Sequence, residues 1–221
     1  MGADDQFHKR KARESKRLER KKAKRSAYEK VLIVCEGEKT EPNYFNELIQ
    51  FYELNTANVA VDGTSGSSPR SVYERAVKLS DNEAKKGDPY DRVYCVFDKD
   101  KHETYNETLK KISNKKPKGK FYYAVSIPCF EYWLLLHFKY TTSPYAAIPG
   151  SSVGHAALKD LKKHMPEYEK GSNNNFVKLI NKLDFAKENA AKSMNDAINN
   201  STDNPSTNIH ILIEYLQNIK I

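Results

Sequence analysis

The chain has 221 residues, enough for one domain with a hydrophobic core or for one domain plus an appendage. Hydrophobic residues make up 38% and charged residues 30%, and no apolar stretch approaches the roughly 18 residues that a membrane span needs. No apolar segment of a secretory signal follows the basic N-terminus, so we expect a cytoplasmic protein without a membrane partner.

The positive charge is concentrated at the N-terminus. Of the net charge of +8, residues 1–30 carry +7, with twelve Lys and Arg against five acids. Between His8 and Arg25 the only large apolar residue is Leu18, so residues 1–29 are predicted to form a basic arm, flexible or helical. The arm either contacts nucleic-acid phosphates or is a solvated tail. Its candidate nucleic-acid-binding residues are Arg17, Arg20, Lys21, Lys22, Lys24 and Arg25.

After the arm, the pattern indicates a strand followed by a helix. Val31 to Cys35 form a continuous apolar run, which is typical of a parallel strand buried on both faces. The run ends at Glu36, and Pro42 lies near the predicted start of a helix. A short second strand is predicted at residues 59–61.

Strands and helices continue to alternate up to about residue 143. Ser68 and Pro69 predict an N-cap and a first helical turn, and Gly87 a stop. The remaining predicted elements are a strand at 92–97, a helix through Leu109 and Ile112, a strand at 121–126 and an apolar helix at 130–138. This alternation predicts an α/β domain over residues 30–143, with a mostly parallel sheet flanked by helices.

The rest of the chain has a different pattern. After Pro144 no run of residues is typical of a strand, and the stretches 155–164, 175–198 and 206–219 have a helical pattern. Residues 144–221 are therefore predicted to form a helical C-terminal extension packed on the sheet domain.

The three cysteines are expected to be reduced. Cys35, Cys95 and Cys129 are far apart, form no CxxC pair and lie in or beside apolar runs. This context is typical of thiols packed as small hydrophobic side chains, and does not favour a disulfide or a zinc site.

Acidic residues follow two of the predicted strands at the point where each strand ends. Glu36 follows the first strand, and Asp98 and Asp100 follow the third. Ligands bind outside the carboxyl ends of parallel strands, so the three carboxylates would meet if these strands are neighbours. Side chains two residues apart in an extended segment point the same way, so Asp98 and Asp100 would face one ion.

A metal ion is the chemistry that these acids favour. Clustered carboxylates repel one another unless a cation neutralises them, and an all-oxygen set suits Mg²⁺ or Mn²⁺. Such an ion assists phosphoryl transfer or phosphodiester hydrolysis. The structural alternative is that acids at strand ends cap the following helices.

Other acids near these strand ends have two interpretations. Gly37 is expected to allow a tight turn that keeps Glu36 exposed. Glu38 and Glu41 are interpreted as partners of the helix dipole, with contact to the surroundings of a metal as the lesser alternative. Glu131 either reaches the same sheet edge as a further catalytic carboxylate or stabilises its own helix N-terminus. Further side chains considered were Lys39, Lys99, Lys101 and His102 beside the acids, and His137, which we expect to be a packed helix residue.

Four segments resemble a known family in their order and spacing. VLIVCEGE with VYCVFDKD is similar to the Toprim domain of topoisomerases, primases and overcoming-lysogenization-defect nucleases. Together with SIPCFEYWLLLHF and NPSTNIHILIEYL, these segments resemble the RloB-like family, described as Toprim-like, over roughly residues 30–217. The resemblance covers nearly everything except the basic arm.

The resemblance implies a function as well as a fold. By it, Glu36, Asp98 and Asp100 are Mg²⁺ or Mn²⁺ ligands, and Glu131 belongs to the catalytic set. It implies a metal-dependent nuclease of bacterial anti-phage defence, similar to the RloB-type component of the AbiL abortive-infection system. The expected partners are DNA or RNA, including tRNA, and an AAA- or ABC-type ATPase encoded nearby. The alternatives are a catalytically silent nucleic-acid-binding or regulatory subunit, and phosphate-ester chemistry on small molecules.

Overall fold

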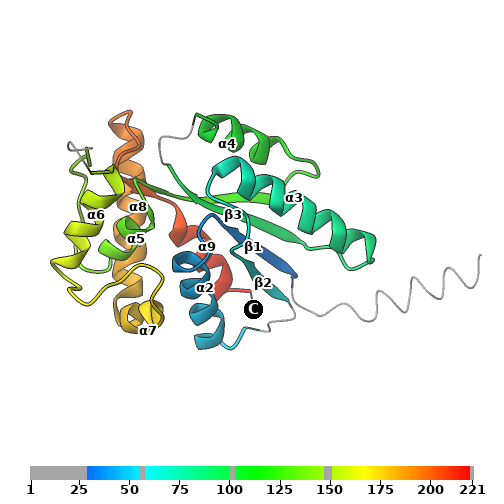
Figure 1. Ribbon diagram of the computed structural model, residues 1–221, viewed down its shortest axis with the longest axis horizontal. Helices are drawn as coiled ribbons and strands as arrows, with labels where there is room; N and C mark the ends of the chain where they lie inside the picture. Colours follow the sequence, from blue (N-terminus) through cyan, green and yellow to red (C-terminus); the bar gives the residue numbers. More distant parts are fainter. Residues whose placement is uncertain (1–28, 55–57, 100–102, 147–150, 220–221) are drawn as a thin grey trace, which may run out of the picture.

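In a computed structural model, the protein folds around a five-stranded sheet flanked by helices on both faces (Figure 1). The structure describes residues 29–54, 58–99, 103–146 and 151–219. Residues 1–28 of the predicted arm, with its candidate nucleic-acid-binding residues, and the predicted ligand Asp100 lie outside them. None of the helices in the described ranges has the length and apolar character needed to cross a membrane.

The strand order is β2-β1-β3-β4-β5. Strands β1 (Val31–Cys35), β2 (Val59–Asp62), β3 (Arg92–Asp98) and β4 (Phe121–Ile127) are parallel, whereas β5 (Ser206–Thr207) pairs antiparallel with β4. The expected α/β class with a mostly parallel sheet is confirmed. Because β1 and β3 are direct neighbours, the acids that follow these two strands come to the same edge of the sheet.

Alternate residues of each strand bury their side chains in two separate cores. On one face, Ile33, Val96 and their neighbours pack with α2 (Thr40–Phe51), α5 (Phe130–Leu135), α8 (Leu183–Asn199) and α9 (Ile209–Gln217). On the other face, Leu32 and Cys95 pack with α3 (Pro69–Lys85) and α4 (Tyr105–Asn114). Figure 1 shows α3 and α4 on one side of the sheet and α2 and α9 on the other. Burial on both faces explains the uninterrupted apolar runs.

The predicted caps and thiols agree with the structure. The Ser68 side chain accepts a hydrogen bond from the backbone N–H of Ser71 and caps α3, Pro69 occupies the first turn, and Gly87 after the helix has a φ of +85°. Cys35, Cys95 and Cys129 are all buried and free.

The C-terminal region is mostly helical but is not separate from the sheet. It contains α6 (Val153–Lys162), α7 (Asn175–Leu179), a 3₁₀ turn (Ile180–Lys182), α8 and α9. The expectation of helix throughout 206–219 is wrong at its start, because Ser206 and Thr207 form β5. There Thr207 Oγ1 donates to the carbonyl of Val125 (2.9 Å) and lies 3.0 Å from Ser126 Oγ. A two-residue strand is too short to leave a periodic pattern in the sequence.

Candidate functional site

Glu36 and Asp98 are joined directly, although 62 residues separate them in the chain. The backbone N–H of Glu36 donates to the carbonyl of Val96 (2.9 Å), which continues the β1–β3 pairing by one residue. The Glu36 side chain then accepts a hydrogen bond at Oε2 from the backbone N–H of Asp98 (3.1 Å). The sequence prediction that the acids after the first and third strands converge is therefore confirmed for these two residues.

Asp98 is surrounded by other acids. Burial raises the pKa of its carboxyl well above the usual range, and the negative charges of Glu41, Glu131 and Glu36 raise it further. The backbone N–H of Phe130, at the start of α5, donates to the carboxylate and acts in the opposite direction. Asp98 thus lies where the side chain of Glu36, which follows β1, meets side chains from α2 and α5.

Glu41 is one of the acids around Asp98, whereas the sequence analysis favoured a role for it as a partner of the helix dipole. It lies in the first turn of α2, as a partner of the helix dipole would, but it is only 7% exposed. Burial raises its pKa to about 7, with further contributions from Glu131 and Glu36. In sequence, an acid in the first turn of a helix is indistinguishable from an ordinary dipole partner, and only the burial separates the two.

Gly37 leaves room for the side chain of Glu41, a role that the sequence analysis did not predict. A Cβ at this position would lie 2.5 Å from Glu41 Oε2, which is closer than any ordinary contact. Gly37 therefore leaves the space into which the buried Glu41 carboxylate folds. Its neighbour Glu38 is exposed.

Glu131 is also buried, at 1% exposure, and the C-terminal region supplies its partners. The hydroxyl of the buried Tyr168 donates to Oε1 (3.1 Å), and Lys170 Nζ forms an ion pair with the same oxygen (3.1 Å). Burial alone would lower the pKa of Lys170, but the charge of Glu131 outweighs this and the pKa is raised. Glu131 lies in the first turn of α5 and is also close enough to Asp98 for its charge to raise the pKa of that carboxyl, so its catalytic role stays a prediction.

Gly171 fastens this segment to the start of α2. Its N–H donates to Thr40 Oγ1 (3.0 Å), and its carbonyl accepts from Asn43 Nδ2 (3.0 Å). Gly171 has a φ of +75°, and a Cβ there would lie 2.9 Å from Lys39 Cβ, so only glycine fits without strain. The contacts of Tyr168 and Lys170 were missed in the sequence because they depend on this long-range attachment.

We expect Lys170→Met to destabilise the protein by about 1 to 2 kcal/mol, because the buried Glu131 would lose the cation that pairs with it. This figure is reduced for the 59% exposure of the Lys170 side chain. Urea denaturation would measure the loss. Lys178→Met, which removes a looser and more exposed pair with Glu167, serves as the control. An equal effect of both substitutions would contradict the assignment.

Two other charged side chains at this edge are already paired with partners of their own. Asp62, at the end of β2, accepts hydrogen bonds from Arg75 Nη2 (2.8 Å) and from Thr64. Lys99 forms an ion pair with Asp203 and lies over the Tyr105 ring. Lys99 is therefore engaged away from the acids. His137 is buried, as expected, but it lies in the turn after α5, because this helix ends at Leu135 and not at residue 138; its Nδ1 lies 3.2 Å from the carbonyl of Trp133.

The four acids Glu36, Glu41, Asp98 and Glu131, called the carboxylate cluster below, have the chemistry of a divalent-cation site. All donors are oxygen, and their mutual repulsion is what a cation would relieve. Within the described ranges, no three His, Cys, Asp or Glu side chains stand close enough to form a ready ligand set. The predicted third ligand, Asp100, lies outside these ranges, so the ligand set Glu36, Asp98 and Asp100 stays a prediction.

The fold and the cluster define an α/β protein with buried carboxylates at the carboxyl edge of a parallel sheet. A comparison with protein families gives a more specific identity. The chain belongs to the RloB-like protein family, whose model matches residues 31–216. No curated protein and no solved structure matches the chain.

Proposed function

We propose that this protein is a metal-dependent nuclease that hydrolyses phosphodiester bonds of DNA or RNA. The observation that carries the proposal is that Glu36 and Asp98, at the ends of two adjacent parallel strands, are hydrogen-bonded to each other through the Glu36 carboxylate and the Asp98 backbone N–H. Glu41 and Glu131 are close enough to raise the pKa of the Asp98 carboxyl. The carboxyl edge of a parallel sheet is where such folds bind their ligands. Family membership agrees with the implied Toprim-like nuclease chemistry.

Each member of the cluster has a role in this proposal. Glu36 and Asp98, with Asp100, would hold Mg²⁺ or Mn²⁺, and the bound ion would polarise the scissile phosphodiester. Glu41 and Glu131 complete the negative field that attracts the cation. Lys170 pairs with Glu131 and is partly exposed, so its ammonium group can also neutralise a phosphate oxygen of the substrate. The attacking group would be water.

The wider biological role follows from the family resemblance. We include in the proposal a role in bacterial anti-phage defence, with a partner ATPase that controls the activity. Binding of the ATPase, tested by co-purification of the two gene products, would support this part.

Cleavage of plasmid, single-stranded DNA and total tRNA in Mg²⁺, Mn²⁺ or EDTA tests the nuclease itself. We expect cleavage with either metal, no cleavage in EDTA, and a loss of at least roughly a hundredfold in Glu36→Gln, because one ligand charge is removed. The matched control is Glu38→Gln, since Glu38 is an exposed acid two residues away. Cleavage that persists in EDTA would contradict the proposed metal chemistry. Nucleic-acid binding without cleavage, even with the ATPase present, would favour the catalytically silent alternative.

A further inference from the structure

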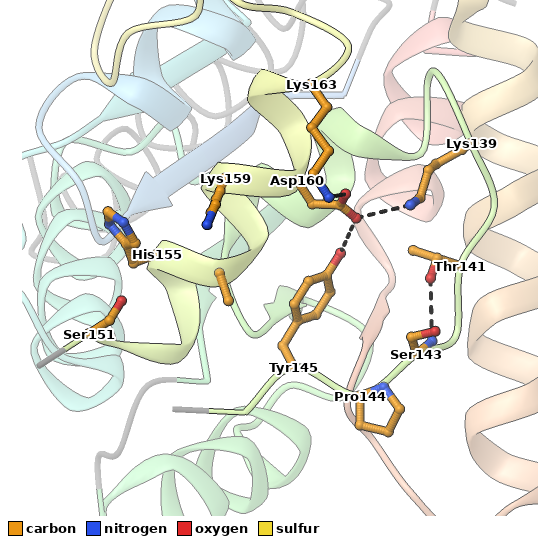
Figure 2. A pocket seen from close by; sticks show the side chains of 11 residues that line it. Lys139, Thr141, Ser143, Pro144, Tyr145, Ser151, His155, Lys159, Asp160 and Lys163 are labelled. Atoms are coloured by element: carbon orange, nitrogen blue, oxygen red, sulfur yellow. Dashed lines mark hydrogen bonds and ion pairs between the residues drawn. The ribbon is translucent and has the colours of Figure 1, made fainter. Parts of the chain in front are cut away.

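Beside the sheet edge lies a pocket of about 570 Å³, formed by the segment after α5 and by helix α6 (Figure 2). This volume is in the range of sites that bind small molecules or single nucleotides, about 300 to 1,000 Å³. The proposed nuclease chemistry does not use the pocket.

The charged lining of this pocket is mainly basic. Lys139, Lys159 and Lys163 line it, with Asp160 as the one acid among its lining residues. Asp160 accepts hydrogen bonds or ion pairs from Lys139 Nζ (3.0 Å), Lys163 Nζ (3.0 Å) and the Tyr145 hydroxyl (3.2 Å). Three ammonium groups against one carboxylate leave the lining with a net positive charge.

Among the described residues, Lys159 has no carboxylate partner, so its charge in the pocket is not neutralised. His155, Lys159 and Lys163 follow one another at four-residue intervals, so His155 and Lys159 share one face of α6 and Lys163 continues it at the C-cap. Like charges at this spacing destabilise a helix slightly, and Asp160 offsets this for Lys163. Lys159 is exposed, and Figure 2 draws no interaction from it or from His155 to the other lining residues. A face of this kind suits an anionic ligand.

Hydroxyl groups add hydrogen-bond donors to the same lining. Thr141, Ser143 and Ser151 line the pocket. Ser151 Oγ is buried and has no hydrogen-bond partner in the part of the chain that the structure describes. An unsatisfied buried hydroxyl costs free energy, which a ligand oxygen can recover.

A short connection links the pocket to the carboxylate cluster. Near the start of α6, the carbonyl of Gly154 lies 3.7 Å from Cys129 Sγ, which donates to it. The next residue after Cys129 is Phe130, whose N–H donates to Asp98. The N-terminal end of α6 therefore lies against the same turn that positions Asp98.

We propose that this pocket binds a backbone phosphate of the substrate strand and so holds the strand beside the carboxylate cluster. The inference rests on the proposed function and deepens it, since it assigns where the uncleaved part of the strand is held. Ammonium groups and hydroxyls are common donors to phosphate oxygens in nucleic-acid complexes. A cluster of acids repels a polyanion, and a basic pocket next to it offsets that repulsion.

Lys159→Glu tests the inference, with Lys78→Glu as the matched control. Lys78 is an exposed lysine on α3, which covers the opposite face of the sheet, and its substitution changes the net charge equally. Binding of short fluorescent single-stranded DNA and RNA to the full chain is followed by anisotropy in EDTA, so that no cleavage occurs. We expect Lys159→Glu to weaken binding roughly tenfold and to reduce the salt slope by about 0.7 for each lost phosphate contact, with Lys78→Glu unchanged. Thermal unfolding confirms that both variants are folded.

Equal binding by Lys159→Glu and Lys78→Glu would overturn the inference. Binding of AMP is measured in the same way. If Lys159→Glu loses AMP binding but still binds the strand, the inference is overturned too, because the pocket would then bind a free nucleotide. Cleavage by the native protein with unchanged strand binding in Lys159→Glu removes this inference and leaves the nuclease proposal. If strand binding depends on Lys159 but the native protein shows no cleavage, the nuclease proposal fails and the phosphate-binding pocket stands.

Discussion

Asp98→Asn is expected to abolish metal-dependent cleavage while making the metal-free protein more stable. The amide keeps an oxygen that can accept the hydrogen bond from the Phe130 N–H, so the local fold should persist. The substitution removes a partly buried charge that Glu41, Glu131 and Glu36 repel. We expect cleavage to fall at least roughly a thousandfold, a barrier increase of about 4 kcal/mol.

Asp98→Asn is expected to lower the activity but to raise the stability, and this combination distinguishes a functional role of Asp98 from a structural one. Relief of the repulsion should stabilise the metal-free protein by about 1 kcal/mol, or ~2–4 °C in Tm for a chain of this size. Mg²⁺ should raise the Tm of the native protein but have little effect on Asp98→Asn, because binding to the folded state alone adds stability. Scanning calorimetry with Mg²⁺ and with EDTA measures both. A variant that is less stable and still responds to Mg²⁺ would contradict the metal-site assignment, whereas Glu38→Gln should behave as native.

The free energy of unfolding of the metal-free protein is expected to fall as pH rises towards neutrality. Burial and the neighbouring acids raise the pKa of Glu41 from 4.5 to about 7. Below about pH 4.5 the group is protonated in both states and contributes nothing. Between these values the unfolded chain releases its proton first, which favours unfolding, and above pH 7 the cost stays constant at about 3 kcal/mol.

His137 acts in the opposite direction over a different range. Burial lowers its pKa to about 4, so its effect on stability grows as pH rises and ends near pH 6.5. A decline between about pH 6.5 and 7 can therefore be assigned to the carboxylate cluster, where Asp98 acts in the same direction as Glu41. Urea denaturation in EDTA at several pH values measures it. Glu41→Gln should flatten the decline and Glu38→Gln should not, and a native protein whose stability is level over this range would contradict the prediction.

The local elements of this protein could be predicted because their causes are local. A strand buried on both faces must be apolar throughout, so Val31–Cys35 was recognisable without any knowledge of its neighbours. Ser68 and Pro69 marked the start of α3 because a cap hydrogen-bonds within its own first turn. The acids at the strand ends were visible for the same reason, since each one interrupts an apolar run.

The membership of the carboxylate cluster was only partly visible. Glu36 and Asp98 were predicted from the rule that parallel strands place their carboxyl ends at one edge, once β1 and β3 are assumed to be neighbours. Glu41 resembled an ordinary first-turn acid, and its carboxylate lies in space that a side chain at Gly37 would enter. Tyr168 and Lys170 carry no signal at all, because their approach to Glu131 depends on the attachment of Gly171 to α2.

The sequence by itself determined the α/β class, the apolar strands, the helix caps, the reduced cysteines and two of the acids, all of which follow from periodicity or short-range hydrogen bonding. Only the tertiary structure decided that β1 lies beside β3, that Glu41 and Glu131 are buried next to the partly buried Asp98, and that Lys139, Lys159 and Lys163 line one pocket. The physical reason is that burial and electrostatic coupling depend on distances between residues far apart in the chain, and these distances exist only after the elements have packed.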